Sequence, residues 1–110
     1  MEDLQNSGQL KMRIYAMMNP STENFDYFFP KGPQKNGRLN VGSVKLYIDG
    51  ALGSRGALLL DPYSDMPGHY GLQIHEKKYY DSICKMAYDA GFQVNTHAIG
   101  DSGNRIMLQT

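Results

Sequence analysis

Two stretches that end in glycine turns constrain the fold of this chain more than any other feature. Residues 44–57 read Val-Lys-Leu-Tyr-Ile-Asp-Gly-Ala-Leu-Gly-Ser-Arg-Gly-Ala, and residues 95–101 read Asn-Thr-His-Ala-Ile-Gly-Asp. Each alternates like a strand before its glycine and carries an unusual polar side chain near its carboxyl end, Lys45 in the first and His97 in the second. Parallel sheets and barrels build active sites at the carboxyl ends of their strands. We therefore expect Lys45 and His97 to share one site.

Hydrophobic periodicity along the chain predicts alternating strands and helices. The predicted elements are the tail of a helix at 1–9, strands at 10–18 and 41–48, a helix at 76–90, a strand at 92–99 and a helix from about residue 102. Residues 19–40 are predicted to form a long loop with one helical turn, and residues 54–74 a hairpin-like flap. This order of elements is typical of a parallel sheet with helical crossovers.

The faces of the predicted strands favour a barrel over a doubly wound sheet. One face of the strand at 41–48 is apolar, and the other carries Ser43, Lys45 and Tyr47. Doubly wound sheets are usually apolar on both faces, whereas a barrel interior becomes an active site at one end. We predict an α/β chain that forms part of a TIM (β/α)8 barrel. Since a complete barrel needs about 250 residues, residues 1–110 are expected to be a single segment, truncated at both ends.

Composition and charge exclude several classes of partner. Eleven basic and eleven acidic residues cancel, so no attraction to nucleic acid or to an anionic membrane is expected. No apolar run reaches the ~18 residues of a membrane span, and the amino-terminal residues lack a signal-peptide pattern. The single cysteine, Cys84, cannot form an internal disulfide, which fits a reducing compartment. We expect a cytoplasmic protein, with export left open because the native amino terminus is expected to be missing.

Lys45 is open to two interpretations. It is either a lysine on the solvated face of a half-buried strand or a group that faces the interior of a barrel. A bare ammonium inside a barrel is costly unless it is paired or neutralised. A buried lysine loses its proton readily, and the neutral amine can add carbon dioxide to form a carbamate that bridges two divalent metals.

His97 and three loop residues complete the candidate site. A histidine near a strand end is either structural or a metal ligand, and neutral imidazole is the commonest metal-binding side chain, especially for zinc. Asp49 is either a turn residue or part of the site, and Asp101 either an acid at a helix amino terminus or part of the site. Arg55 forms either a structural ion pair or a contact with a substrate carboxylate. We take Asp49, Arg55 and Asp101 as candidate substrate-binding residues.

Together, these motifs resemble the metal-dependent amidohydrolase superfamily, and within it amidohydrolase family 3, which includes N-substituted formamide deformylase-like proteins. The likeness runs from about Leu10 to the end and is strongest over residues 41–101. It rests on residues 44–57, on Asp-Pro-Tyr-Ser-Asp at 61–65, on His-Ala-Ile-Gly-Asp at 97–101 and on Asn104-Arg105.

The resemblance implies a barrel enzyme that hydrolyses carbon–nitrogen bonds other than peptide bonds in a small amide or cyclic amide. It implies one or two divalent metals, with zinc as the expected ion, held by Lys45 as the carboxylated fourth-strand lysine and by His97 as the fifth-strand histidine. The family's His-x-His pair, sixth-strand histidine and eighth-strand aspartate have no counterpart here. The chain is therefore expected to span about the third to fifth strands, to hold an incomplete metal site with no catalytic residue of its own, and to be inactive alone.

Two other functions stay open at this point. The chain could be a non-catalytic α/β module that needs complementary segments or partners to fold, and open sheet edges would favour self-association. It could also be a phosphate- or nucleotide-binding domain that uses the glycine turns at Gly50–Gly53 and Gly100. The spacing of these glycines matches neither the dinucleotide fingerprint nor the P-loop.

Overall fold

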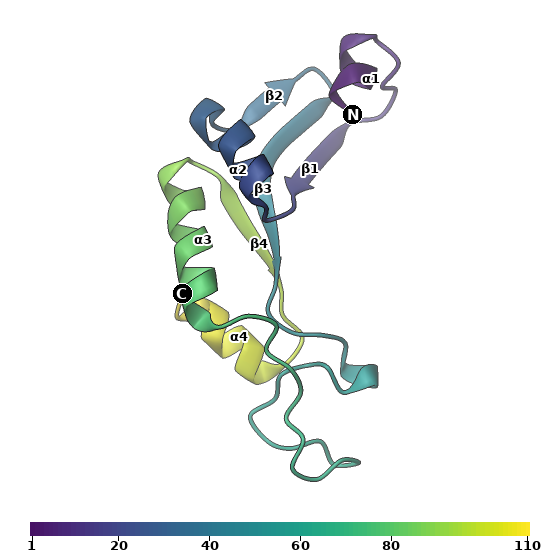
Figure 1. The fold of residues 1–110 in the computed structure, drawn as a ribbon. Coiled ribbons are helices and arrows are strands. Elements are labelled where there is room, and N and C mark those ends of the chain that lie inside the picture. The colour runs from purple at the N-terminus through teal and green to yellow at the C-terminus, as the bar shows by residue number, and fades with distance from the viewer. The chain divides into compact units, whose positions relative to one another are not determined.

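The computed structural model describes residues 1–110 as an α/β chain (Figure 1). Its elements are α1 Glu2–Asn6, β1 Ile14–Met18, α2 Thr22–Phe28, β2 Gln34–Asn36, β3 Leu39–Tyr47, α3 Lys77–Asp89, β4 Gln93–His97 and α4 Asp101–Leu108, with short 3-10 helices at Phe29–Lys31 and Leu52–Ser54. The chain is divided into two compact units. The first unit comprises Met1–Lys45 and Lys85–Asn95, and the second comprises Leu46–Cys84 and Thr96–Thr110. No helix is both long and apolar enough to cross a membrane.

The strands form one sheet with β3 at its centre. β1 pairs with β3 in parallel, β2 pairs with it antiparallel, and β4 also pairs with it. The parallel pairing confirms the predicted fold class. The prediction that residues 19–40 form a loop with one helical turn was partly wrong, because this stretch contains α2 and β2. β2 reads Gln-Lys-Asn, which has no apolar alternation, so its pairing depends on backbone contacts that the pattern does not reveal.

A bulge in β3 decides which of its side chains face the core of the first unit. In the register with β1, Val41 and Ser43 pair with consecutive residues, so Gly42 is the extra residue. Val41 packs in the core cluster, whereas Ser43 pairs with Met17, which is 47% exposed. Directly paired side chains share one face of a sheet. Ser43, and with it Lys45 two residues on, therefore lies on the face turned away from this core.

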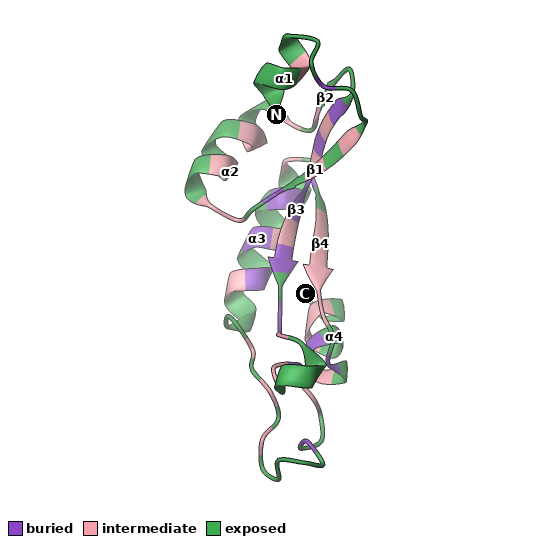
Figure 2. Ribbon diagram, turned by 90° about the vertical axis from the view of Figure 1, so that its right-hand side faces the viewer, coloured by how far each residue is buried: buried purple, intermediate pink, exposed green.

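Buried positions recur along α3 with helical spacing (Figure 2). Tyr80, Ile83 and Ala87 are buried, as the periodicity predicts, and Cys84 is half-buried. Burial raises the pKa of the Cys84 thiol, so the thiol stays protonated at neutral pH. We assign Cys84 a packing role and no role as a nucleophile.

We expect Tyr80 to make the free energy of unfolding fall at alkaline pH. Its phenol is fully buried, donates to the Tyr47 carbonyl at 2.9 Å and accepts the His75 N–H at 3.1 Å. Burial raises the pKa of Tyr80 above the ordinary 10.0. The folded state thus favours the neutral phenol. The contribution of Tyr80 to the free energy of unfolding is complete below the pKa of the phenol in the unfolded chain, and it is lost as pH rises towards the higher pKa in the folded protein.

The measurement is denaturant unfolding from about pH 8 to about pH 11 for the wild type and Tyr80→Phe. The variant should be less stable by about 1–3 kcal/mol at the lower pH, because a carbonyl and an amide lose their partner. It should also lose less stability as pH rises. An identical pH dependence in the two proteins would contradict this role of Tyr80.

The connection between β3 and α3 is a long loop that folds back on itself (Figure 1). The Leu59 N–H donates to the Tyr70 carbonyl at 2.8 Å, and the Tyr63 N–H donates to the His69 carbonyl at 2.9 Å. These bonds join the two arms like a hairpin, as predicted for residues 54–74, although no regular strands form. The Tyr63 hydroxyl donates to the Ala57 carbonyl at 2.8 Å, which ties the turn of the loop to its first arm.

Candidate metal and substrate site

Asp49, two residues beyond β3, is the centre of the polar network in the second unit. Asp49 is only 1% exposed. Oδ1 accepts the Ile99 N–H at 3.0 Å, and Oδ2 accepts the N–H groups of Gly100 at 2.7 Å and Leu58 at 2.9 Å. Hydrogen bonds to an ionised carboxylate are stronger than neutral ones, and a buried charge needs such partners. Asp49 therefore joins the end of β3 to the turn after β4 and to the long loop.

Two further contacts fasten the long loop to the amino-terminal end of α4. The Gly103 N–H donates to the Leu58 carbonyl at 3.2 Å. Asp101 Oδ1 accepts the Leu60 N–H at 2.9 Å and the Ser102 N–H at 2.8 Å. The structure thus gives Asp101 both the helix-terminal role expected of an acid there and an anchoring role towards the loop.

His97 is the last residue of β4 and lies beside the buried carboxylate. Its carbonyl accepts the Ile48 N–H at 3.0 Å, so the ends of the two strands adjoin at this point. Its Nε2 lies 3.9 Å from Asp49 Oδ1, and its side chain is 32% exposed. The rings of His97 and Tyr47 are 5.5 Å apart. The imidazole is therefore framed by an aromatic ring and a carboxylate while it stays accessible.

Arg55 lies in the long loop in the left-handed backbone region, with φ of 58°. Its Nε donates to Asp65 Oδ1 at 3.2 Å and its Nη2 to Asp65 Oδ2 at 2.9 Å. This pairing lowers the pKa of Asp65 and raises that of Arg55. His69 Nε2 also lies 2.9 Å from the Arg55 carbonyl. In the structure, Arg55 therefore forms an ion pair with Asp65. Its contact with a substrate carboxylate stays a prediction.

Lys45 is half-buried on β3 and shares its sheet face with Ser43. The Ser43 hydroxyl is fully buried and has no hydrogen-bond partner. An orphaned buried hydroxyl calls for an explanation, such as a water or an ion beside it. The sequence did not indicate a special role for this hydroxyl, because a serine on a mixed polar and apolar strand face is common.

The donor chemistry of Lys45 and His97 fits two ligands of a metal site. Divalent metals such as zinc accept imidazole nitrogen and anionic oxygen, and carboxylation would give Lys45 such an oxygen. No three His, Cys, Asp or Glu side chains of residues 1–110 cluster as ligands. Lys45 belongs to the first unit and His97 to the second, so the predicted shared cavity stays a prediction.

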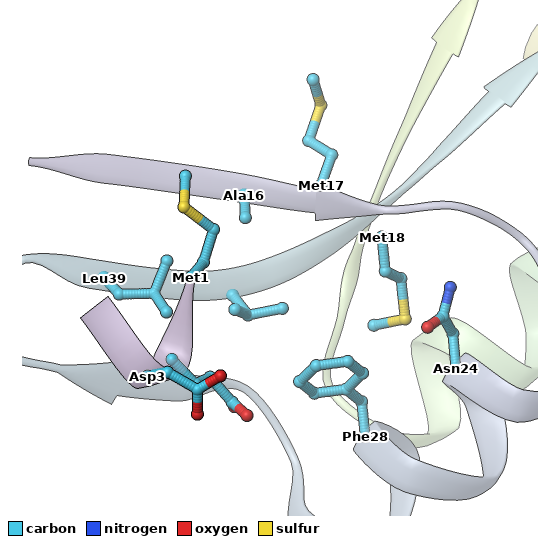
Figure 3. A pocket seen from close by; sticks show the side chains of 10 residues that line it. Met1, Asp3, Ala16, Met17, Met18, Asn24, Phe28 and Leu39 are labelled. Atoms are coloured by element: carbon cyan, nitrogen blue, oxygen red, sulfur yellow. The ribbon is translucent and has the colours of Figure 1, made fainter. Parts of the chain in front are cut away.

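A cavity of about 340 Å³ lies in the first unit. It opens on the core side of β1 and is lined by apolar side chains with an acidic edge at Glu2 and Asp3. Met18 and Phe28 point towards each other inside it (Figure 3). None of Lys45, His97, Asp49, Arg55 and Asp101 lines this cavity, so we do not assign it to the metal and substrate site.

A match over nearly the whole length of the chain shows which family it belongs to. Residues 1–109 match the family described as Amidohydrolase family, and the chain belongs to that family. Similar curated proteins are the Protein LONG AFTER FAR-RED 3 of Arabidopsis thaliana, 39% identical over 76% of this chain, and the Putative amidohydrolase YtcJ of Bacillus subtilis (strain 168), 43% identical over 57% of it. The chain spans only 14% and 12% of these two relatives.

Solved structures with the same fold are two described as uncharacterized metal-dependent hydrolases, from Pyrococcus furiosus and Pyrococcus horikoshii OT3. Each superimposes with a TM-score of 0.90 over 98% of this chain at 34% identity. The chain covers 23% and 22% of these structures. The likeness confirms the predicted fold, an α/β arrangement with parallel strands that corresponds to part of an amidohydrolase TIM barrel.

Proposed function

We propose that this chain is the central segment, about the third to fifth strands, of a metal-dependent hydrolase barrel that cleaves carbon–nitrogen bonds other than peptide bonds. Membership of the amidohydrolase family supports this proposal, as does the likeness to two metal-dependent hydrolases. The observation that carries it is the position of each residue on its own strand, Lys45 near the carboxyl end of β3 and His97 at the carboxyl end of β4. Active sites of such barrels lie at this end of the strands.

In this proposal, Lys45 as a carbamate and His97 hold one or two divalent ions, with zinc as the expected metal. A bound ion of this kind lowers the pKa of a water and polarises the scissile carbonyl. The residues of this chain orient the ligands. Tyr47 walls one side of the imidazole, and the orphaned Ser43 hydroxyl supplies a donor on the face that carries Lys45.

We propose a small amide, a formamide or a cyclic amide as the substrate. Arg55 and Asp101 are the residues assigned to substrate contact, and Asp49 and Arg55 are assigned to the shape of the loop beside the metal. In this proposal the chain belongs to the branch of the family that includes N-substituted formamide deformylase-like proteins. We further propose a cytoplasmic location, self-association through open sheet edges, and no activity in the isolated 110-residue chain.

Removal of the metal tests the function directly. We expect the full-length enzyme to lose activity on formamides and cyclic amides when a chelator strips its metal, and to regain it when zinc is restored, because the ion activates the attacking water. Metal content by atomic spectroscopy and amide hydrolysis are measured on the same samples. The isolated chain, assayed in parallel, should show neither. Full activity in metal-free enzyme would overturn the proposal.

A further inference from the structure

We propose that Asp49 is a positioning residue that holds His97 and the long loop in the geometry of the hydrolytic site. This inference rests on the proposed function. In this assignment the carboxylate is neither a metal ligand nor a substrate contact, because the residue is buried and both oxygens accept backbone N–H groups. It acts through the backbone that it holds and through the imidazole that it faces.

The hydrogen bonds of Asp49 come from the segments that carry the candidate site. Ile99 and Gly100 directly follow His97 in the chain, and Leu58 lies three residues after Arg55. Their three N–H groups converge on one carboxylate at 2.7–3.0 Å. Because Asp49 holds two successive amides of the turn after β4, it also restricts the position of the His97 side chain at the end of that strand. The same carboxylate also holds Leu58, which lies in the loop that bears Arg55.

Asp49 also faces the imidazole itself. Its Oδ1 lies 3.9 Å from His97 Nε2, a distance at which the two groups interact electrostatically without a hydrogen bond. Carboxylates that face a ligating histidine orient the ring and raise its basicity, and the loss of such a partner weakens metal binding about ten- to a hundredfold. Asp49 is therefore placed to act on His97 both through the backbone and through the ring.

Gly103 in α4 provides independent evidence that the fold makes room for this carboxylate. A Cβ at Gly103 would lie 3.0 Å from Asp49 Oδ2 and 3.2 Å from Ile48 Cγ2. A glycine inside a helix costs about 1 kcal/mol relative to alanine. The helix keeps glycine at the point where any side chain would press on the carboxylate, so the position of Asp49 takes precedence over helix propensity.

The test compares zinc affinity in variants of the full-length enzyme. Asn keeps the size of Asp49 but offers a single acceptor oxygen and turns an NH₂ group towards backbone donors. We expect Asp49→Asn to bind zinc about ten- to a hundredfold more weakly in competition with a chelating dye. Asp81→Asn is the matched control, since it makes the same change at an exposed α3 residue that pairs with Lys77. It should bind zinc like the wild type.

Gly103→Ala keeps the test decisive if Asp49→Asn fails to fold. Alanine favours the helix but presses on Oδ2, so this variant should stay folded by circular dichroism and bind zinc several-fold more weakly. Wild-type zinc affinity in folded Asp49→Asn, or in Gly103→Ala if Asp49→Asn does not fold, would overturn the positioning role. The proposed function would fail separately, if His97→Ala bound zinc like the wild type.

Discussion

Lys45→Ala should reduce hydrolysis by the full-length enzyme about a thousandfold or more, the equivalent of about 4 kcal/mol of activation free energy. In the proposed site, Lys45 as a carbamate would supply an anionic oxygen ligand to the metal, and alanine removes that ligand. The activated water and the polarised carbonyl depend on those metals. Metal content should fall with activity, and both are measured on the purified variant.

Two further lysine variants sharpen this prediction. Lys45→Arg keeps a positive charge but cannot form a carbamate, since the guanidinium stays protonated, so it should be as inactive as Lys45→Ala. Lys35→Ala removes an exposed lysine of β2 and should leave metal content and rate unchanged. Wild-type metal content and activity in Lys45→Ala would refute the assignment of Lys45.

Gly100→Ala should destabilise the protein by more than about 4 kcal/mol, a size reserved for a few mechanisms that disrupt the core or backbone. The φ of Gly100 is −71°, which any residue adopts, so the reason is space. A Cβ there would lie 1.8 Å from the Leu58 carbonyl oxygen and 2.4 Å from its carbon. The two segments would have to separate. That movement would break the 2.7 Å bond from the Gly100 N–H to Asp49.

Gly53→Ala is the control, because a Cβ there meets nothing within 4 Å. Its effect on the free energy of unfolding should stay within about 0.5 kcal/mol. Both variants are compared with the wild type by denaturant unfolding, and poor soluble expression of Gly100→Ala alone agrees with the prediction. A Gly100→Ala protein within about 1 kcal/mol of the wild type would show that the loop can move away without loss.

Local pattern predicted much of the secondary structure. The buried stripe of α3 and the strands β1, β3 and β4 follow from spacing that each segment carries in its own residues. The shared face of Ser43 and Lys45 was predicted from alternation and agrees with the register across the bulge at Gly42. β2 escaped prediction because its three polar residues pair through the backbone alone.

The candidate residues were identified from sequence, whereas the role of Asp49 was not. An Asp-Gly pair after a strand indicates a turn, and nothing near Asp49 in sequence reveals partners that lie nine, fifty and fifty-one residues away. The sequence likewise left two interpretations of Arg55 open, and the structure shows its guanidinium in a bidentate pair with Asp65. Such pairings depend on which loops meet, and this is set by the packing of distant segments.

The sequence by itself determined the class of the fold, the family and the candidate ligands Lys45 and His97, because periodicity and short motifs are local properties of the chain. Only the tertiary structure decided that Asp49 is a buried anchor, that Gly100 and Gly103 are needed for close approach, and that the Ser43 hydroxyl is orphaned. The physical reason is that burial and steric contact depend on distances between residues far apart in the chain, and these distances exist only once the segments have packed.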